Sequence, residues 1–171
     1  LLAELAPVLT ALLIVGRAGS ALCAELGVMR LSEQIEALEC LAIDVYNFLV
    51  SPKLLAALIA VPLLIFIFTV SGILGGYVSG SLILGVSVGD YYQSIRDVMD
   101  AETIRMALIK GIVFSIFIIT VTAYKGLYVH QSANNITGKG ALALSRATTQ
   151  AVVIASVGIL ILDYLLTAVL I

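Results

Sequence analysis

Apolar residues run along this chain in four long blocks separated by short polar stretches. The blocks cover Leu1–Leu26, Ser51–Gly80, Arg105–Tyr124 and Ala147–Ile171. Each is long enough for an α-helix to cross the hydrocarbon core of a bilayer, which takes about 20 residues. Ser51-Pro52 is typical of a helix start, because serine caps the first turn and proline is tolerated there. The pattern predicts an all-α, polytopic membrane helix bundle with four spans.

Composition agrees with this class. Hydrophobic residues make up 61% of the chain and charged residues 12%, and the mean hydropathy is +1.16, values outside the range of soluble globular domains. No basic cluster suggests nucleic acid as a partner. We interpret residues 1–171 as a single membrane domain. Because the chain begins at Leu1, without Met and already inside an apolar block, we expect it to be a fragment whose N-terminal part is missing.

Lysine and arginine are unevenly distributed among the connections between the blocks. The first and third connections, counted with the adjoining ends of the blocks, contain Arg30, Lys53, Lys125, Lys139 and Arg146. The second connection, counted in the same way, contains only Arg96 and Arg105, beside several acids. The positive-inside rule therefore predicts that the first and third connections are cytoplasmic and that both ends of this chain lie outside.

The apolar blocks also carry charges that a simple membrane anchor would lack. Glu4, Arg17 and Glu25 belong to the first block, and a lone charge at mid-bilayer costs about 2.5–3.5 kcal/mol on insertion scales. We therefore expect each of them to have a protein partner, water or an interface. Asp163 in the fourth block is a further intramembrane acid, which we interpret as a polar packing contact rather than a lipid ligand.

Residues Leu31–Val45 have the pattern of a short amphipathic helix. Apolar residues recur at helical spacing on one face, Ser32 is a candidate N-cap, and an acidic face is formed by Glu33, Glu36, Glu39 and Asp44. One interpretation is a helix lying at the membrane surface, and the other is a helix that docks on a cytoplasmic protein. Surface helices usually carry Lys and Arg toward anionic lipid, so the acidic face favours docking on a protein.

Small residues in the second block predict a close helix contact. Gly72, Gly76 and Gly80 recur at every fourth residue, a spacing that lets two helix backbones approach closely in lipid. The contact is either ordinary packing within the bundle, which we favour, or a contact between two copies.

Sequence motifs for catalysis are incomplete. Gly85–Gly89 matches the G-x-S-x-G pattern around Ser87, but His130, the single histidine, is predicted on the opposite side of the membrane, which argues against a Ser–His pair. Gly16–Ser20 lacks the Lys-Ser/Thr of a phosphate-binding loop. No cysteine spacing fits a metal site. We expect no metal site and no enzymatic activity in this chain.

Several short motifs follow one another along nearly the whole chain. They are Glu4-Leu5-Ala6-Pro7-Val8-Leu9-Thr10, Gly16-Arg17-Ala18-Gly19-Ser20-Ala21, Ala24-Glu25-Leu26-Gly27, Glu33-Gln34, Ser51-Pro52-Lys53, Ser145-Arg146-Ala147-Thr148-Thr149, Leu162-Asp163-Tyr164 and Leu166-Thr167-Ala168. This series resembles MlaE-type permeases, the membrane subunits of ABC transporters that move lipids between membranes. Such permeases begin with an interfacial helix and one more span, so the resemblance implies that both are missing here.

The resemblance implies a multi-pass permease of the inner membrane of a Gram-negative bacterium. Such a permease moves phospholipid between inner and outer membrane and contributes to outer-membrane lipid asymmetry. It implies a homodimer, a cytoplasmic ABC ATPase that holds ATP and Mg²⁺, and a periplasmic MCE-type lipid-binding protein. No cofactor is expected in this chain itself.

The resemblance also implies roles for individual residues. Leu31–Val45 would be the coupling helix, whose contacts with the ATPase would be made by Glu33, Ile35, Glu36 and Leu38. Glu4 and Pro7 would face a lipid cavity between the two permease copies. Arg17 and Glu25 would hold the first span and the coupling helix together.

Two other classes of function remain open. One is an ion-coupled secondary transporter, whose relay would consist of Glu4, Arg17, Glu25 and Asp163. The other is a scaffold or receptor that transports nothing. Within the ABC class, an MCE-linked importer of sterol or fatty acid is a further alternative. The acidic amphipathic helix favours the ABC class, because an ion-coupled carrier needs no cytoplasmic docking surface.

Overall fold

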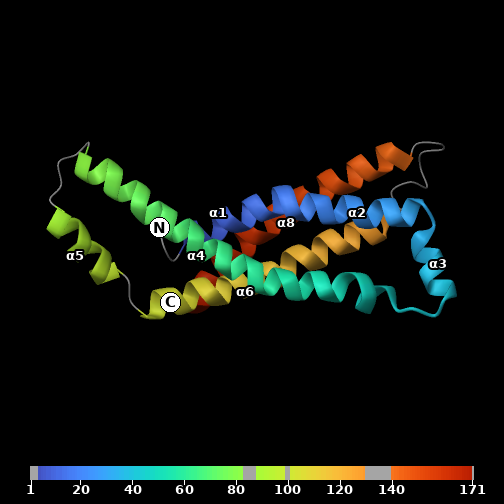
Figure 1. Cartoon of the computed structure of the whole chain (residues 1–171), viewed down its shortest axis with the longest axis horizontal. Helices are drawn as coiled ribbons and strands as arrows, with labels where there is room; N and C mark the ends of the chain where they lie inside the picture. The colour runs from blue at the N-terminus through green and yellow to red at the C-terminus, as the bar shows by residue number, and fades with distance from the viewer. Residues whose placement is uncertain (1–3, 83–87, 99–100, 130–139, 171) are drawn as a thin grey trace.

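The computed structural model is an elongated bundle of helices and describes residues 4–82, 88–98, 101–129 and 140–170 (Figure 1). Within these ranges every regular element is helical. The four stretches that are long and apolar enough to cross a membrane are Leu5–Leu31, Tyr46–Gly80, Glu102–Leu127 and Gly140–Val169. The predicted all-α membrane bundle with four spans is therefore confirmed.

The first span is built from three helical pieces. α1 (Leu5–Ile14) and α2 (Ser20–Leu31) are joined by η1 (Val15–Gly19), a single π-helical turn. Such turns are rare, and they are found mostly as one-turn bulges inside α-helices. The helix continues through α2 beyond the predicted end of the span at Leu26.

The second span begins earlier than predicted. The π-helical turn η2 (Tyr46–Val50) runs directly into α4 (Ser51–Leu82), and Ser51 has helical backbone angles, φ −57° and ψ −48°. The prediction that Ser51 caps the start of a helix is therefore wrong. Pro52 has no N–H to donate back along the helix, so the hydrogen-bond ladder is interrupted here, where the π-turn gives way to α4.

The third and fourth spans are single helices. α6 covers Ala101–Leu127 and α8 covers Gly140–Leu170. α8 begins at Gly140 rather than near Ala147. The residues between these two positions are mostly Ala and Leu, which are strong helix formers.

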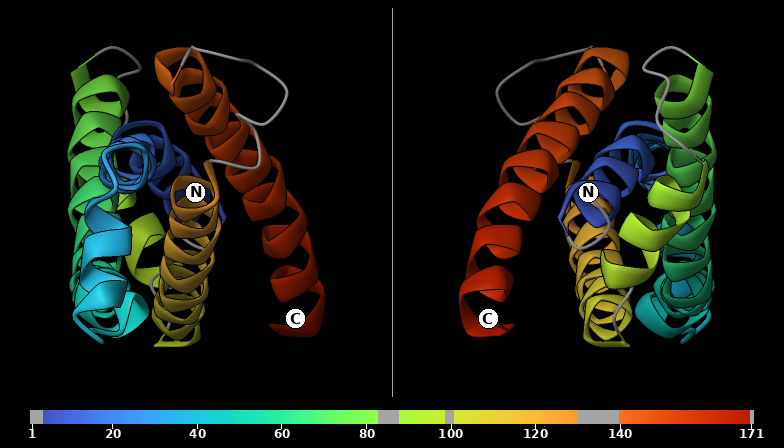
Figure 2. Two further views of the ribbon diagram at one scale, coloured as in Figure 1. Left: turned by 90° about the vertical axis from the view of Figure 1, so that its right-hand side faces the viewer. Right: turned by 90° about the vertical axis from the view of Figure 1, so that its left-hand side faces the viewer.

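α6 is the central helix of the bundle and contacts all the other spans. The end-on views show α4 and α8 on opposite flanks, with α6 and the first span between them (Figure 2). Phe114 and Ile118 of α6 are buried in one apolar cluster with residues of α1 and α8. Farther along α6, Ala123 and Leu127 are buried in a second cluster with residues of α2.

Gly126 allows α6 and α2 to approach closely. A Cβ atom at this position would lie 2.9 Å from the carbonyl oxygen of Cys23 and 2.9 Å from Cβ of Leu26, shorter than an optimal van der Waals separation. Because one obstructing atom belongs to the backbone, the two helices would have to move apart. Cys23 itself is buried, in agreement with a packing role.

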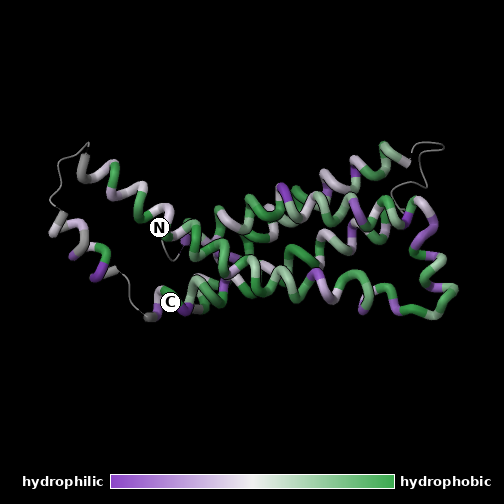
Figure 3. Tube along the Cα trace, in the orientation of Figure 1, coloured by the Kyte–Doolittle hydropathy of each residue, from purple (hydrophilic) through white to green (hydrophobic). Residues whose placement is uncertain are grey.

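Large apolar side chains cover the outer surface of the spans. On α4, Leu55, Ile59 and Leu63 are exposed at successive turns. Apolar positions extend along the spans, and hydrophilic ones occur at α3 (Gln34–Cys40) and α5 (Val88–Val98), at opposite ends of the bundle (Figure 3). So much contiguous apolar surface marks a membrane-facing surface, which agrees with a multi-pass membrane protein.

The glycine ladder of α4 contacts α5 of the same chain. Tyr91 of α5 donates a hydrogen bond of 2.7 Å to the carbonyl oxygen of Ile73. A Cβ atom on Gly76 would lie 2.7 Å from the Tyr91 hydroxyl oxygen. At Gly76 the ladder therefore makes room for a tyrosine side chain of the same chain, and a close approach of two helix backbones along the ladder, within the bundle or between two copies, stays a prediction.

We expect Gly126→Ala to lower the thermal stability of the purified protein in detergent, because the added methyl group meets the Cys23 carbonyl. Gly75→Ala is the matched control: a Cβ there meets no atom within 4 Å, and Ala is favoured over Gly inside a helix by about 1 kcal/mol. Circular dichroism during heating measures both unfolding midpoints. Equal or higher stability of Gly126→Ala would contradict the close contact between α2 and α6.

Candidate functional site

A buried lysine organises the end of the bundle where α1 begins. Lys110 of α6 is 0% exposed, and its Nζ lies 3.0 Å from Glu4 Oε2 and 2.9 Å from Asp163 Oδ1. Lys110 also donates a hydrogen bond of 2.8 Å to Thr167 Oγ1, and Thr167 donates to the Glu4 carboxylate at 3.1 Å. Asp163 and Thr167 share one face of α8 because they are four residues apart. These four side chains, the polar network, join three spans.

The polar network is explained by the cost of burying charge. An ammonium group in apolar surroundings must be paired or give up its charge. Here the carboxylates of Glu4 and Asp163 both lie beside the single ammonium group of Lys110. The side chain of Asp163 is 17% exposed and that of Glu4 is 45% exposed. Of the three alternatives expected for Glu4, a protein partner, water or an interface, the structure shows a protein partner, Lys110. Glu4 is also where the network reaches the exterior of the chain.

Lys110 was not singled out from the sequence, although the signal was present. It is the only charged residue between Arg105 and Lys125, five residues after the start of the third predicted span. An ionisable residue inside a span is by default a functional or structural site, so the reasoning applied to the first block also identifies Lys110.

Pro7 is fully buried among the helices of its own chain. Its side chain therefore does not face outward toward a cavity, which corrects the expectation from the resemblance. Proline is tolerated in the first turn of α1 because the first N–H groups of a helix have no partner within it. A lipid contact stays a prediction for Glu4.

A groove runs between the first span and α4. Its larger part has a volume of about 550 Å³ and includes Arg17 and Thr10. The adjoining part has a volume of about 420 Å³ and includes Glu25 and Lys53. The lining of both parts includes Ile14, Ala18, Ala21 and Leu64. The two parts therefore form one mostly apolar groove along the bundle.

Glu25 and Arg17 are placed differently from the expectation. Glu25 forms an ion pair with Lys53 in the first turn of α4, so it joins the first span to the second. Arg17 is exposed toward the groove, and its side chain forms no hydrogen bond or ion pair with any residue that the structure describes. Neither residue makes a polar contact with α3, which corrects the prediction that they hold the coupling helix.

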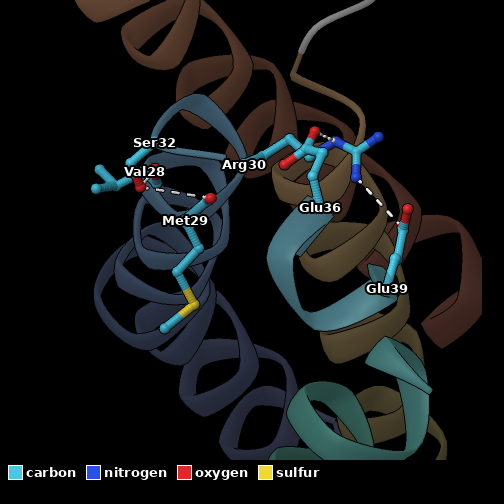
Figure 4. Close-up of polar contacts among 6 residues, drawn as sticks. All are labelled: Val28, Met29, Arg30, Ser32, Glu36 and Glu39. Carbon is cyan, nitrogen blue, oxygen red and sulfur yellow. Dashed lines mark hydrogen bonds and ion pairs between the residues drawn. The ribbon is translucent and has the colours of Figure 1, made fainter. Parts of the chain in front are cut away.

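Arg30 makes the connection to α3 instead. Its Nε lies 3.3 Å from Glu36 Oε1 and its Nη1 lies 3.5 Å from Glu39 Oε1 (Figure 4). One guanidinium reaches both acids because residues three apart lie on the same side of a helix. Partly exposed pairs of this kind contribute about 0–1 kcal/mol each to stability. Their main effect here is to orient α3 against the end of α2.

The helix predicted over Leu31–Val45 is shorter in the structure. Residues with left-handed backbone conformations bound it, Glu33 with φ 59° and Ala42 with φ 58°. Ser32 donates a hydrogen bond of 2.8 Å to the carbonyl oxygen of Val28 (Figure 4). Ser32 therefore ends α2, and the prediction that it caps α3 is wrong. The left-handed residue at Glu33 turns the chain out of α2 and into α3.

The apolar side of α3 faces the bundle. Ile35 is 1% exposed and lies in one cluster with Leu22 and Leu127, against which Leu38 also packs. The resemblance implied that Ile35 contacts an ATPase, and the structure corrects this, because a side chain buried in its own chain has no surface for a partner. The exposed residues of α3 and its start are Glu33, Gln34, Ala37, Glu39 and Cys40.

Ser87 of the G-x-S-x-G pattern and His130, which the sequence analysis predicts on opposite sides of the membrane, lie outside the described residues. Among the residues that the structure does describe, no group of three His, Cys, Asp or Glu side chains could hold a metal ion.

Comparisons with known proteins agree on one family. The family model with the description Permease MlaE matches residues 1–169. A probable ABC transporter permease protein of Rickettsia bellii is 40% identical over 164 residues, which are 96% of this chain and 60% of the relative. The intermembrane phospholipid transport system permease protein MlaE of Haemophilus influenzae is 36% identical over 171 residues, 99% of this chain and 62% of the relative.

A more distant relative comes from a plant. The chloroplastic protein TRIGALACTOSYLDIACYLGLYCEROL 1 of Arabidopsis thaliana is 32% identical over 165 residues, 96% of this chain and 45% of the relative. This chain spans 60% and 62% of the length of the two bacterial relatives named above.

We expect Lys110→Met to destabilise the bundle strongly, because Glu4 and Asp163 then lose their shared counter-ion. Breaking a buried pair by removing one partner costs about 3–5 kcal/mol. The triple variant Glu4→Gln/Lys110→Met/Asp163→Asn removes all three charges and should recover most of the lost stability. The measurement is the monodisperse fraction after heating in detergent, by size-exclusion chromatography. Native-like stability of Lys110→Met alone would show that the polar network does not hold the spans together.

Proposed function

Because this chain belongs to the MlaE permease family, we propose that it forms the membrane permease of an ABC transporter for phospholipid. The proposed transporter moves phospholipid between the inner and outer membranes of a Gram-negative bacterium and contributes to outer-membrane lipid asymmetry. The observation that carries this proposal is the family match over nearly all of the four-span bundle. The name of the H. influenzae relative, an intermembrane phospholipid transport permease, supports phospholipid as the cargo.

The proposed assembly contains two copies of the permease, two cytoplasmic ABC ATPase subunits and a periplasmic MCE-type lipid-binding protein. ATP and Mg²⁺ bind to the ATPase, so this chain needs no cofactor and performs no catalytic step. The name of the R. bellii relative, an ABC transporter permease, supports an ATPase partner. The exposed apolar side chains on α4 and α8 offer surfaces on which a second copy could pack within the membrane.

α3 is the proposed coupling helix, on the cytoplasmic side that the positive-inside rule predicts. Its outer surface is acidic, and its inner surface is fixed to the bundle by Arg30 and Ile35. A force on the exposed surface of α3 would therefore be passed to α2 and α6, because packed interfaces shift as units rather than deform gradually. This geometry supports alternating access driven by the partner ATPase.

The ion-coupled alternative has less support. A relay needs ionisable groups that pass protons or ions from one to the next. The four proposed members fall into three separate places: the polar network, the ion pair with Lys53, and the groove at Arg17. In a lipid permease the apolar groove can hold lipid and the acidic surface of α3 can dock on an ATPase, whereas an ion-coupled carrier needs neither feature.

The cargo can be identified from the lipid that remains bound to the purified complex. We expect phospholipid to be the main species in mass spectrometry, since the H. influenzae relative carries a phospholipid name. Sterol or fatty acid in place of phospholipid would contradict the proposed cargo and favour the importer alternative.

The coupling surface can be tested by reversing one charge. We expect Glu33→Lys to reduce the amount of ATPase retained on the purified permease, because a like-charge contact at an interface costs several kcal/mol. Glu36 is unsuitable for this test because it is paired with Arg30.

The control is Glu102→Lys, which reverses an exposed acid in the first turn of α6, at the other end of the bundle. It should leave ATPase retention unchanged. Full retention of the ATPase and normal lipid-stimulated ATP hydrolysis in Glu33→Lys would contradict the assignment of α3 as the coupling helix.

A further inference from the structure

We propose that the groove between the first span and α4 binds an anionic lipid during its transit, with the headgroup at Arg17 and Thr10. One acyl chain of this lipid lies along the apolar wall that α4 provides. This inference rests on the proposed function, because it names the place within this chain through which the lipid passes. It is carried by one cation, one buried hydroxyl and the shape of the groove.

The cation is Arg17, which lines the larger part of the groove. Its side chain forms no hydrogen bond or ion pair within the described part of the chain, whereas the charges of Glu4, Glu25 and Asp163 are all paired. Arg17 also lies in the π-helical turn η1, and such turns occur frequently at functional sites. A guanidinium binds phosphate and carboxylate oxygens through paired hydrogen bonds, so an anion is the ligand that it fits.

A second donor lies beside it. Thr10 is 5% exposed, and its Oγ1 is buried without a hydrogen-bond partner. Buried hydroxyl groups nearly always have a partner, and a missing one needs an explanation. Thr10 lines the same part of the groove as Arg17, and residues seven apart lie on the same side of a helix. A headgroup oxygen at this position would supply the missing partner.

The remaining lining suits an acyl chain. On the α4 side it includes Leu64, Ile67 and Phe68. The volume of about 550 Å³ lies within the range of small-molecule sites, roughly 300–1,000 Å³. A groove that is mostly apolar and has a cation on one wall fits an amphiphile with an anionic group. A small anion such as free phosphate would leave the apolar part of this volume unfilled.

The depth of Arg17 in the span distinguishes a transported lipid from an ordinary membrane lipid. Arg17 lies near the middle of the Leu5–Leu31 span. At about 1.5 Å per residue it is about 18 Å from Leu5 and about 21 Å from Leu31. A lipid of either leaflet keeps its headgroup at the membrane surface, about 15 Å from the midplane. A lipid that has left its leaflet would bring an anionic group to this cation.

The test uses the permease purified with its ATPase and reconstituted in phosphatidylcholine liposomes. The probe is phosphatidylglycerol with a photoactivatable acyl chain, and the readout is the label on the α4 peptide that contains Leu64 and Phe68. We expect Arg17→Gln to lower this label about tenfold, the loss of about 1.4 kcal/mol of binding. Arg17→Lys should restore most of it, and Arg96→Gln, an exposed arginine of α5, should have no effect.

Three competitors identify the source of the anionic group. Unlabelled phosphatidylglycerol should displace the probe, while inorganic phosphate and uncharged diacylglycerol should not. Thr10→Val removes the hydroxyl at nearly constant volume and should lower the label about threefold. This second variant keeps the proposal testable if Arg17→Gln fails to assemble.

The proposed site would be overturned if Arg17→Gln carried as much label per assembled complex as the native protein. It would also be overturned if diacylglycerol displaced the probe as well as phosphatidylglycerol does. Arg17→Gln that loses its second copy but labels normally would show that Arg17 pairs with protein instead. If the native complex moves phospholipid with ATP and Arg17→Gln moves it at the same rate, this site is refuted and the proposed function is left intact. A native complex that moves no phospholipid would refute the proposed function itself.

Discussion

A charged amine buried in a membrane bundle dictates where the surrounding helices lie. Lys110 projects from the central helix α6, and the groups that neutralise it come from Glu4 before α1 and from Asp163 and Thr167 of α8. Because none of these charges can be left unpaired in apolar surroundings without a large cost, the three helices cannot slide past one another independently. The polar network therefore sets the register of the bundle, and the apolar clusters along α6 pack within that register.

The opposite end of the bundle is held by weaker contacts. Arg30 reaches two acids of α3, and Glu25 reaches Lys53 of α4, but all of these side chains are partly exposed. Exposed pairs contribute much less than buried ones. The two ends thus differ: the ion pairs at the end with α3 are exposed and cost little to rearrange, while the buried polar network at Lys110 keeps the spans in register.

Two of the cations inside the spans, Lys110 and Arg17, show two uses of a charge within a membrane. Lys110 is fully buried and has its partners on the same chain, so it is part of the scaffold. Arg17 faces a groove and has no partner among the described residues, so its charge is available to a ligand. Within the described residues, the charge of Lys110 is offset by the chain itself, whereas the charge of Arg17 is not.

The sequence by itself determined the number of spans and the need for partners at Glu4. A helix across lipid must satisfy its own backbone and be apolar along its length, and both properties can be counted in a linear sequence. It also indicated the acidic helix after the first span. The tertiary structure alone decided that Glu4 pairs with Lys110, that Ile35 points inward and that Ser32 ends α2. The first two outcomes depend on the rotation and register of helices far apart in the chain, and periodicity within one helix carries no information about either. The third is local: Ser32 donates a hydrogen bond to the carbonyl oxygen of Val28 at the end of α2, where the sequence equally allowed it to cap the next helix.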